Sequence, residues 1–144
     1  IWLILKYGKK RNAESAKKDP AHIVALRKLD MYRGNKMWAP EKQKAFYSGI
    51  TATLRRYIDA RHDIGVMEMT TGEIMKDLKK TDVAEDLQSG LKELFERADF
   101  VKFAKYTASD EDNAAALPLA VRFVTSTYQT EVEEDNEDAK KGGE

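Results

Sequence analysis

The chain has 144 residues, the size of one ordinary domain, and with 42% hydrophobic and 35% charged residues it is apolar enough to fold around one core. Its formal net charge is zero, which excludes an overall basic field of the kind that attracts nucleic acid or anionic lipid. The lack of cysteine excludes a disulfide framework and thiolate chemistry, and the sequence has no Gly-rich phosphate loop, His-Glu-x-x-His run or Gly-x-Ser-x-Gly elbow.

The chain begins apolar and then becomes basic. It opens with five apolar residues, Ile1-Trp2-Leu3-Ile4-Leu5, and the basic run Lys9-Lys10-Arg11 follows closely. A membrane span takes about 20 apolar residues, but an apolar stretch that ends in a basic cluster is typical of the cytoplasmic end of a span. We therefore interpret residues 1–18 as the end of a membrane span and a basic juxtamembrane segment, at the cytoplasmic face of the inner membrane. The alternative is that these residues fill a core or an interface.

Residues 19–130 are predicted to form a single all-α bundle of about five helices. Asp19 and Pro20 are typical of an N-cap and a first turn, so we expect a first helix that ends before Gly34. Pro40 opens a second helix. Its apolar stripe consists of Phe46, Tyr47, Ile50, Leu54, Tyr57 and Ile58.

Two capping boxes predict the next two helices. Thr70-x-x-Glu73 precedes Ile74 and Leu78, and Asp82-x-x-Glu85 precedes a second apolar stripe, which is Val83, Leu87, Leu91, Leu94 and Phe95. The short link between these helices is typical of a helix-turn-helix or winged-helix-like pair. A DNA-reading helix must face phosphates, whereas the second helix carries four acids, Glu85, Asp86, Glu93 and Glu96, against Lys92 and Arg97. We therefore predict no nucleic-acid partner and keep a DNA-binding regulator as the alternative function.

The last helix is predicted to start at Ser109 and to carry an inward stripe of Leu117, Val121, Val124 and Tyr128. Pro118 lies inside this helix, where it removes a backbone hydrogen bond, so we expect a kink there or a later helix start. Residues 131–144 are acidic and poor in apolar side chains. They are therefore expected to form a disordered tail.

Three stretches resemble a known family. They are Leu54-Arg55-Arg56-Tyr57-Ile58, Met67-Glu68-Met69-Thr70-Thr71-Gly72-Glu73-Ile74 and Ala98-Asp99-Phe100-Val101-Lys102-Phe103-Ala104-Lys105-Tyr106. Over roughly residues 1–128 the chain resembles the cytoplasmic part of single-pass membrane proteins encoded among the Bat aerotolerance genes of Bacteroides-like bacteria, a domain of unknown function. The resemblance implies a helical domain behind one membrane span, with von Willebrand A-type Bat proteins and a MoxR-like ATPase as partners. It implies no catalytic residues.

Two Asp-x-x-His pairs, Asp19 with His22 and Asp59 with His62, are the metal-site candidates. An acid three residues before a histidine on two helices is typical of di-iron bundles, but those sites use Glu and need two further inward acids. Asp19 also suits an N-cap, and His62 lies near a helix end. We therefore predict no metal, no cofactor and no catalytic residue, and a carboxylate and histidine metal-dependent enzyme ranks third among the functions.

Four aromatic residues are the candidates for a partner-docking surface: Trp38, Phe100, Phe103 and Tyr106. Adjacent large apolar groups in a solvated patch often mark partner sites. The interpretation that we favour for Phe100 and Phe103 is ordinary core, since they are three residues apart, and for Trp38 a loop residue packed over the second helix. The function predicted from the sequence is a non-enzymatic interaction or scaffold domain in an aerotolerance or envelope-stress assembly.

Overall fold

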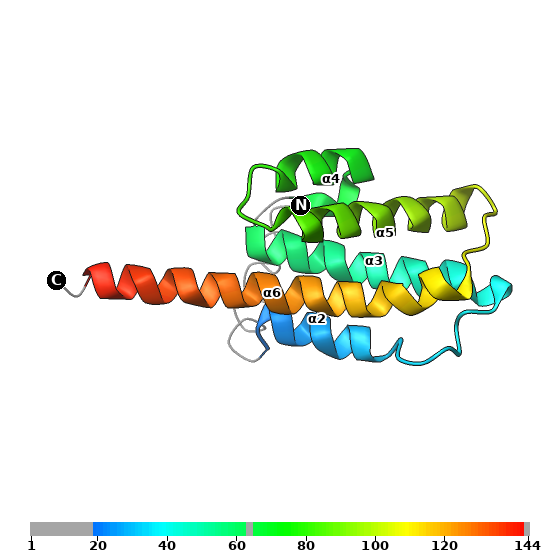
Figure 1. Cartoon of the computed structure of the whole chain (residues 1–144), viewed down its shortest axis with the longest axis horizontal. Coiled ribbons are helices and arrows are strands. Elements are labelled where there is room, and N and C mark those ends of the chain that lie inside the picture. The colour runs from blue at the N-terminus through cyan, green and yellow to red at the C-terminus, as the bar shows by residue number, and fades with distance from the viewer. Residues whose placement is uncertain (1–18, 63–64, 143–144) are drawn as a thin grey trace, which may run out of the picture.

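The computed structural model describes residues 19–62 and 65–142, and within these ranges the chain forms five α-helices, one short 3-10 turn and no strand. The elements are α2 (Ala21–Asp30), α3 (Pro40–His62), η1 (Val66–Glu68), α4 (Thr71–Leu78), α5 (Glu85–Phe103) and α6 (Asp110–Gly142). Helices α2, α3, α5 and α6 lie side by side along one axis, and the short α4 packs on α5 (Figure 1). The prediction of an all-α bundle of about five helices is confirmed.

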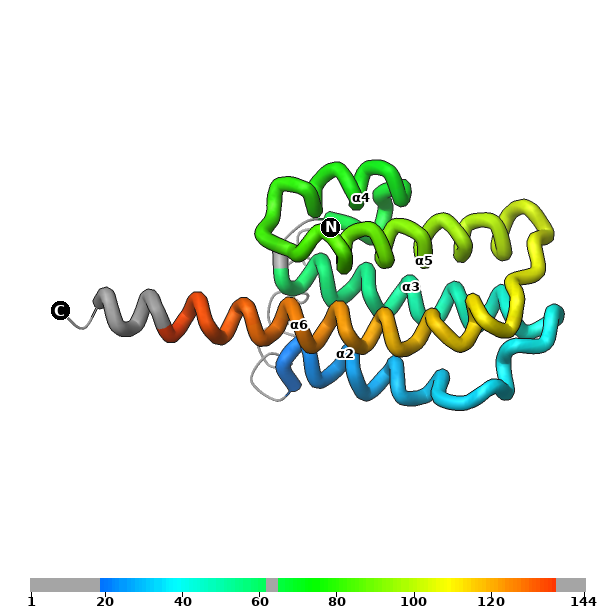
Figure 2. The backbone as a smooth tube through the Cα atoms, in the orientation of Figure 1, coloured from blue at the N-terminus to red at the C-terminus, as the bar shows by residue number. Residues whose placement is uncertain are grey.

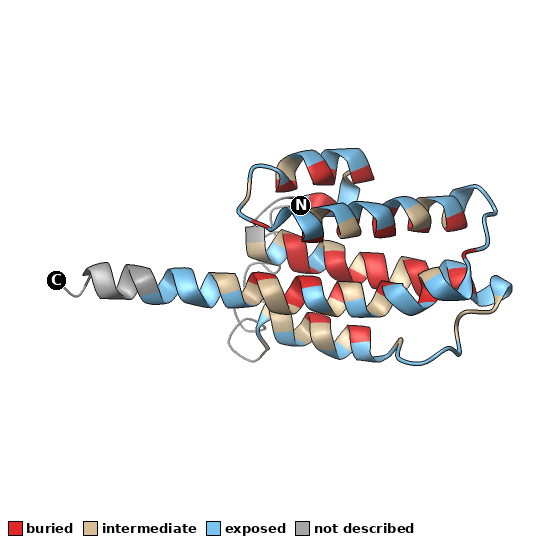
Figure 3. Ribbon diagram, in the orientation of Figure 1, coloured by how far each residue is buried: buried red, intermediate tan, exposed pale blue. Residues whose placement is uncertain are grey.

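Helix α3 is the centre of the bundle, because it contacts α2, α5, α6 and η1. Every residue of its predicted apolar stripe is buried, from Phe46 at 1% exposure to Ile58 at 0%. The buried faces of the surrounding helices all turn toward it (Figure 3). Each large side chain taken out of water in this way contributes about 1.5–3 kcal/mol, so the α3 stripe is the main source of cohesion.

One of the two predicted capping boxes forms. The Thr70 hydroxyl accepts from the Glu73 N–H at 3.3 Å, and the Glu73 carboxylate accepts from the Thr70 N–H at 3.3 Å. The prediction of a capping box at Asp82 is wrong, because α5 starts at Glu85, with Ala84 at the N-cap and no side-chain hydrogen bond from that N-cap. Val83 is 8% exposed, so its insertion into the core holds this stretch extended and delays the helix.

The start of α2 also differs from the prediction. Pro20 occupies the N-cap, no side chain caps the helix, and Asp19 instead pairs with Arg27 at 3.6 Å. The ψ angle of 152° at Pro20 keeps the chain extended up to this point, so the helix begins one residue later than an Asp19 cap requires. The described helices α4 and α5 are joined by residues 79–84 without an accompanying strand, so the wing of a winged-helix unit is not among the described elements.

Helix α6 starts as predicted, because the Ser109 hydroxyl accepts from the Asp112 N–H at 3.2 Å. The helix continues through Pro118, so the alternative of a later start is wrong. Pro118 and Ala114, whose carbonyl loses its partner N–H, are both exposed, so water can satisfy that carbonyl. The buried stripe is shifted from the predicted one: it contains Val124, as expected, together with Ala116, Ala120, Phe123 and Thr127.

The end of α6 leaves the bundle. Residues 131–142 continue the helix, in place of the disordered tail that was expected from residue 131, and residues 131–136 are exposed. Figure 2 shows residues 131–136 projecting beyond the other helices. Ala, Glu and Lys continue a helix at little cost, so a helix that is already formed extends past its packed part.

The described helices include none that is both long and apolar enough to cross a membrane. The predicted end of a span, residues 1–18, lies outside the described residues.

Candidate functional site

Two connections meet at one end of the bundle, which we call the loop end. It is formed by residues 31–39 between α2 and α3, and by residues 104–109 between α5 and α6. Both lie on the right of Figure 1, opposite the projecting C-terminal end of α6. The four aromatic residues that the sequence offers as docking candidates lie on these connections or on the last turn of α5.

Gln43 ties the two connections together. Its side chain is buried at 2% exposure, and its amide nitrogen donates to the Trp38 carbonyl at 2.8 Å and to the Ala108 carbonyl at 3.1 Å. Its amide oxygen accepts from the Ala108 N–H at 2.8 Å. One side chain thus fixes both connections, and Ala108 lies 65 residues after Gln43 in the chain; we call this arrangement the Gln43 clamp. Gln43 was not among the site residues predicted from the sequence, although it lies on the same helical stripe as Phe46, Tyr47 and Ile50.

A second buried hydrogen bond fixes the start of α6. The Tyr47 hydroxyl donates to the Asn113 side-chain oxygen at 2.7 Å, and the Asn113 amide donates to the Ala108 carbonyl at 3.5 Å. Burial raises the pKa of Tyr47 to about 12, and the nearby Arg97 guanidinium opposes this only in part. The hydroxyl therefore stays protonated at physiological pH and keeps its role as donor.

The aromatic residues at the end of α5 are exposed. Phe100 is 56% exposed, Phe103 81% and Tyr106 46%, so the interpretation of Phe100 and Phe103 as core is wrong. The physical reason is the phase of α5, which turns the smaller Ala98 and Val101 inward at 1% and 8% exposure. The three exposed rings form a surface that we call the aromatic patch.

The patch is held in shape by the chain reversal that follows α5. Lys105 has a φ of 53°, in the left-handed region that costs a non-glycine residue about 1–2 kcal/mol. The reversal lets the Tyr106 N–H donate to the Phe100 carbonyl at 3.3 Å. It also places the ring of Tyr106 beside that of Phe100, with 6.2 Å between the ring centroids and 58° between the ring planes. A left-handed residue directly after the C-cap is a common way for a helix to end, so the conformation of Lys105 fixes this turn.

Trp38 lies on the other connection and is half-buried against the core. This agrees with the interpretation of a loop residue packed over the second helix. Beside it is a cavity of about 420 Å³ whose walls include Tyr32, Phe46 and Leu117. The indole Nε1 of Trp38 is buried and has no hydrogen-bond partner among the described residues. Trp38 therefore supports the loop end from within, whereas the aromatic patch faces water.

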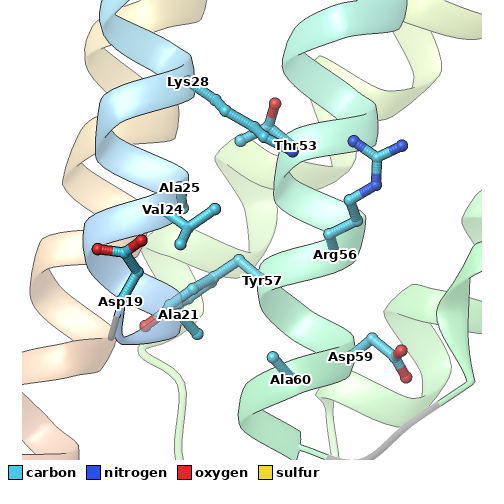
Figure 4. A pocket seen from close by; sticks show the side chains of 10 residues that line it. All are labelled: Asp19, Ala21, Val24, Ala25, Lys28, Thr53, Arg56, Tyr57, Asp59 and Ala60. Carbon is cyan, nitrogen blue, oxygen red and sulfur yellow. The ribbon is translucent and has the colours of Figure 1, made fainter. Parts of the chain in front are cut away.

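A cleft of about 540 Å³ lies between α2 and α3 (Figure 4). In the figure Arg56 and Asp59 point away from α2, while Lys28 extends across toward Thr53. The Tyr57 hydroxyl at its floor is engaged with Thr127 at 2.7 Å and with a backbone carbonyl. The charged groups of this cleft do not converge, so it lacks the paired acid and base that proton-transfer chemistry needs.

The metal-site candidates do not come together in the described part of the chain. No group of three or more His, Asp or Glu side chains there could hold a metal ion. His22 instead stacks on Tyr128, with 3.6 Å between ring centroids. The side chain of His62 lies outside the described residues.

Helix α5, the second helix of the pair that is the candidate for nucleic-acid binding, exposes an acidic face. Glu85, Asp86, Glu93 and Glu96 of α5 are all exposed. Arg122 of α6 pairs with Asp86 at 2.6 Å, so one positive charge that lies near this face is already balanced. A face of this charge would be repelled by phosphates.

Comparison with known proteins adds no relative. No protein-family model matches the chain, and no curated protein or solved structure gives a significant match. The resemblance to the cytoplasmic part of the Bat-associated membrane proteins stays a prediction.

Proposed function

We propose that this domain is a non-enzymatic interaction module of a membrane-anchored protein and that it docks its partner through the aromatic patch. The observation that carries the proposal is the exposure of Phe100, Phe103 and Tyr106 on a buried and hydrogen-bonded scaffold. Covering apolar surface stabilises a complex by about 25 cal/mol per Å². Aromatic side chains are enriched among the residues that contribute most to protein interfaces.

The orientation of the bundle supports this role. The described chain begins at Asp19, which precedes α2 at the end opposite the loop end (Figure 1). Helix α3 has 23 residues and is about 35 Å long, so the patch lies about that far from the point where the chain enters the bundle. With a membrane span upstream, the patch would lie at the end of the bundle opposite the point where the chain enters it.

The resemblance of the sequence suggests which partners to test first. They are the von Willebrand A-type Bat proteins and a MoxR-like ATPase, in an aerotolerance or envelope-stress assembly at the cytoplasmic face of the inner membrane. The scaffold role follows from that resemblance, while the position of the docking surface follows from the exposed rings. The two parts of the proposal can therefore be tested separately.

The experiment is site-specific photo-crosslinking in the native cell. A photoreactive phenylalanine analogue replaces Phe103, and the control position is Met31, which is 78% exposed but lies outside the patch. We expect a discrete protein adduct from position 103 that is absent from position 31 and is lost when Phe100→Ser is added. Mass spectrometry of the adduct then identifies the partner.

Two outcomes would contradict the proposal. Equal adducts from positions 103 and 31 would mean that contact at the patch is not specific. A complete lack of protein adducts at position 103, with lipid adducts in their place, would make the patch a membrane contact.

A further inference from the structure

The aromatic patch continues into the acidic face of α5. Four exposed residues follow one another at spacings of three, four and three positions: Glu93, Glu96, Phe100 and Phe103. Residues at these spacings lie on one side of a helix, so the two acids and two of the three rings form one stripe, which we call the outer stripe. At a rise of 1.5 Å per residue it is about 15 Å long. A partner that covers the rings therefore has acids beside it along the helix.

The two acids of the outer stripe are open to a cation from outside the domain. Glu96 pairs with Lys92 only at 3.9 Å, and both side chains are about half exposed, so this pair is weak. Glu93 has no cation within 4.0 Å of its carboxylate among the described residues. An arriving Lys or Arg side chain can therefore reach both carboxylates.

The first turn of α6 adds negative charge next to the rings. It lies beside α5, because Asp112 pairs with Arg97 at 3.5 Å across the two helices. Asp110 and Glu111 of the same turn are exposed, and within the described ranges neither forms an ion pair. Each of these two acids contributes a charge that no cation of the fold balances.

The lysines near the rings do not reverse the sign of this surface. Lys102 is half-buried on the inward side of α5, where Arg55 and Asp99 are its charged neighbours, so it does not belong to the outer stripe. The exposed lysines of the region are Lys92 and Lys105, against the four exposed acids of the outer stripe and of the first turn of α6. The exposed surface around the rings is therefore negatively charged.

We propose that the partner binds through a basic amphipathic segment that carries a large apolar anchor. The anchor covers Phe100 and Phe103, and one or two Lys or Arg side chains meet Glu93 and Glu96. This inference rests on the proposed function, because it names the class of partner for the same patch. It follows from exposed rings and open carboxylates that share one side of α5.

The geometry of the outer stripe also sets a spacing in the partner. Glu96 and Glu93 precede Phe100 by four and seven residues, which is about 6 and 10 Å along the helix axis. A helical partner that lies along α5 should therefore carry its cations four and seven positions from its anchor. This spacing distinguishes a docked segment from a merely basic peptide.

Other occupants fit the same surface less well. An anionic membrane or a nucleic acid would meet the exposed carboxylates Glu93 and Glu96, which repel phosphates. In a second copy, residues 1–11 combine apolar with basic side chains, but the proposed function assigns them to the membrane segment. A basic segment of a separate protein matches the outer stripe better.

The test is a selection from a random peptide library displayed on phage, with the whole chain as bait and its Phe103→Ser variant for counter-selection. We expect the enriched peptides to combine a large apolar residue with a net positive charge. The tightest peptide is then labelled, and its affinity is measured by fluorescence anisotropy. The double variant Glu93→Lys and Glu96→Lys should weaken its binding by about tenfold or more. Added salt should weaken the binding of the wild type more than that of the double variant.

A matched control separates local from general charge effects. Glu133→Lys with Asp135→Lys makes the same change of charge on the exposed, projecting part of α6 and should alter the affinity by less than about twofold. Glu93→Lys alone changes an exposed side chain that has no ion pair among the described residues, so a weakened affinity there does not come from a lost contact of the fold. Circular dichroism checks the fold of every variant.

Several results would overturn the inference. They are enrichment of neutral or acidic peptides, no enrichment at all, and an equal loss of affinity in the α6 control. Stronger binding to vesicles of mixed phosphatidylcholine and phosphatidylserine, or self-association that the Phe103→Ser change abolishes, would replace the peptide by a membrane or by a second copy. If the photo-crosslink at position 103 still forms while the library yields acidic peptides, the proposed function stands and only the partner class is wrong.

Discussion

The two ends of the bundle expose different kinds of surface to water. At the loop end three aromatic rings are exposed on a chain reversal that the Gln43 clamp and the hydrogen bond from Tyr47 support. At the other end α6 projects with residues 131–136 exposed, and four of these are acids. Charged side chains in water need no compensation, whereas clustered rings in water and a left-handed lysine both cost free energy. This difference is why we propose the docking surface at the loop end and not at the projecting end of α6.

The largest expected effect on stability comes from comparing a buried and an exposed phenylalanine of the same helix. Phe95 and Phe103 both belong to α5, but Phe95 is 1% exposed and Phe103 is 81% exposed. Phe95→Ala should lower the free energy of unfolding by about 3–5 kcal/mol, because it leaves a cavity under Arg55. Phe103→Ala should change it by less than about 0.5 kcal/mol. Urea unfolding followed by circular dichroism measures both, and comparable losses would make the patch part of the core.

The next effect tests the Gln43 clamp. Gln43→Ala removes the partner of the buried Ala108 N–H, and it leaves the Ala108 carbonyl with only the long 3.5 Å hydrogen bond from Asn113. A buried polar group left unpaired costs about 1–3 kcal/mol. We expect a total loss of about 2–4 kcal/mol in the free energy of unfolding, together with faster hydrogen exchange at the Ala108 amide. Gln129→Ala, at an exposed position of α6, is the control and should have almost no effect. If the two variants behave alike, the loop end does not depend on the clamp.

A pH titration tests the buried hydroxyl at the same end. Burial raises the pKa of Tyr47 from 10.0 in the unfolded chain to about 12 in the fold. Below pH 10 both states hold the proton, and above it the unfolded chain loses the proton first. Stability is therefore lost as the pH rises through this window, by up to about 2–3 kcal/mol. Between pH 10 and 12 the free energy of unfolding of Tyr47→Phe should fall by about that much less than that of the wild type. If the free energies of unfolding of the two proteins fall in parallel over this range, the raised pKa of Tyr47 is refuted.

The bundle itself could be predicted from the sequence because its signals are local. The stripe from Phe46 to Ile58 repeats with the helical period, and the Thr70 capping box spans four residues. The exposure of Phe100 and Phe103 was also within reach. Extending the stripe of Leu91, Leu94 and Phe95 by helical spacing leads to Ala98 and Val101, which leaves Phe100 and Phe103 on the outer face.

The support of the candidate site could not be predicted in the same way. The Gln43 clamp depends on Ala108, 65 residues further along the chain, and no local pattern indicates that pairing. The left-handed conformation of Lys105 is equally hidden, because such turns usually carry glycine or asparagine. The acidic end of α6 was predicted as disordered from its composition, which ignores the propagation of a helix that has already formed.

At the opposite end of the bundle, stability should depend on Glu131 and not on Glu133. The Arg61 side chain is 6% exposed and donates to the Glu131 carboxylate at 2.9 Å, whereas Glu133 is exposed and pairs with no cation among the described residues. Glu131→Gln should cost about 1 kcal/mol of stability, an amount reduced by the 48% exposure of Glu131 and by added salt. Glu133→Gln should cost nothing measurable in the same unfolding experiment. Equal costs would mean that the projecting helix is held by more than this contact.

The smallest expected effect on stability is that of Lys105→Gly. This change should raise the stability of the fold and weaken the binding of the partner. Glycine adopts a φ of 53° without the clash that Lys105 has there, but it also leaves the unfolded chain more freedom. Lys105→Gly should therefore raise the free energy of unfolding by only about 0.5 kcal/mol. The same change frees Tyr106 from its fixed position beside Phe100 and removes one positive charge; the first effect should be the larger, so the partner protein should bind the aromatic patch more weakly. Lys105→Asn separates the two causes, since asparagine tolerates this backbone better than most residues but keeps it less flexible than glycine does. If the asparagine variant binds as weakly as the glycine variant, the charge matters most; if it binds more tightly, the strained turn serves to hold the rings together.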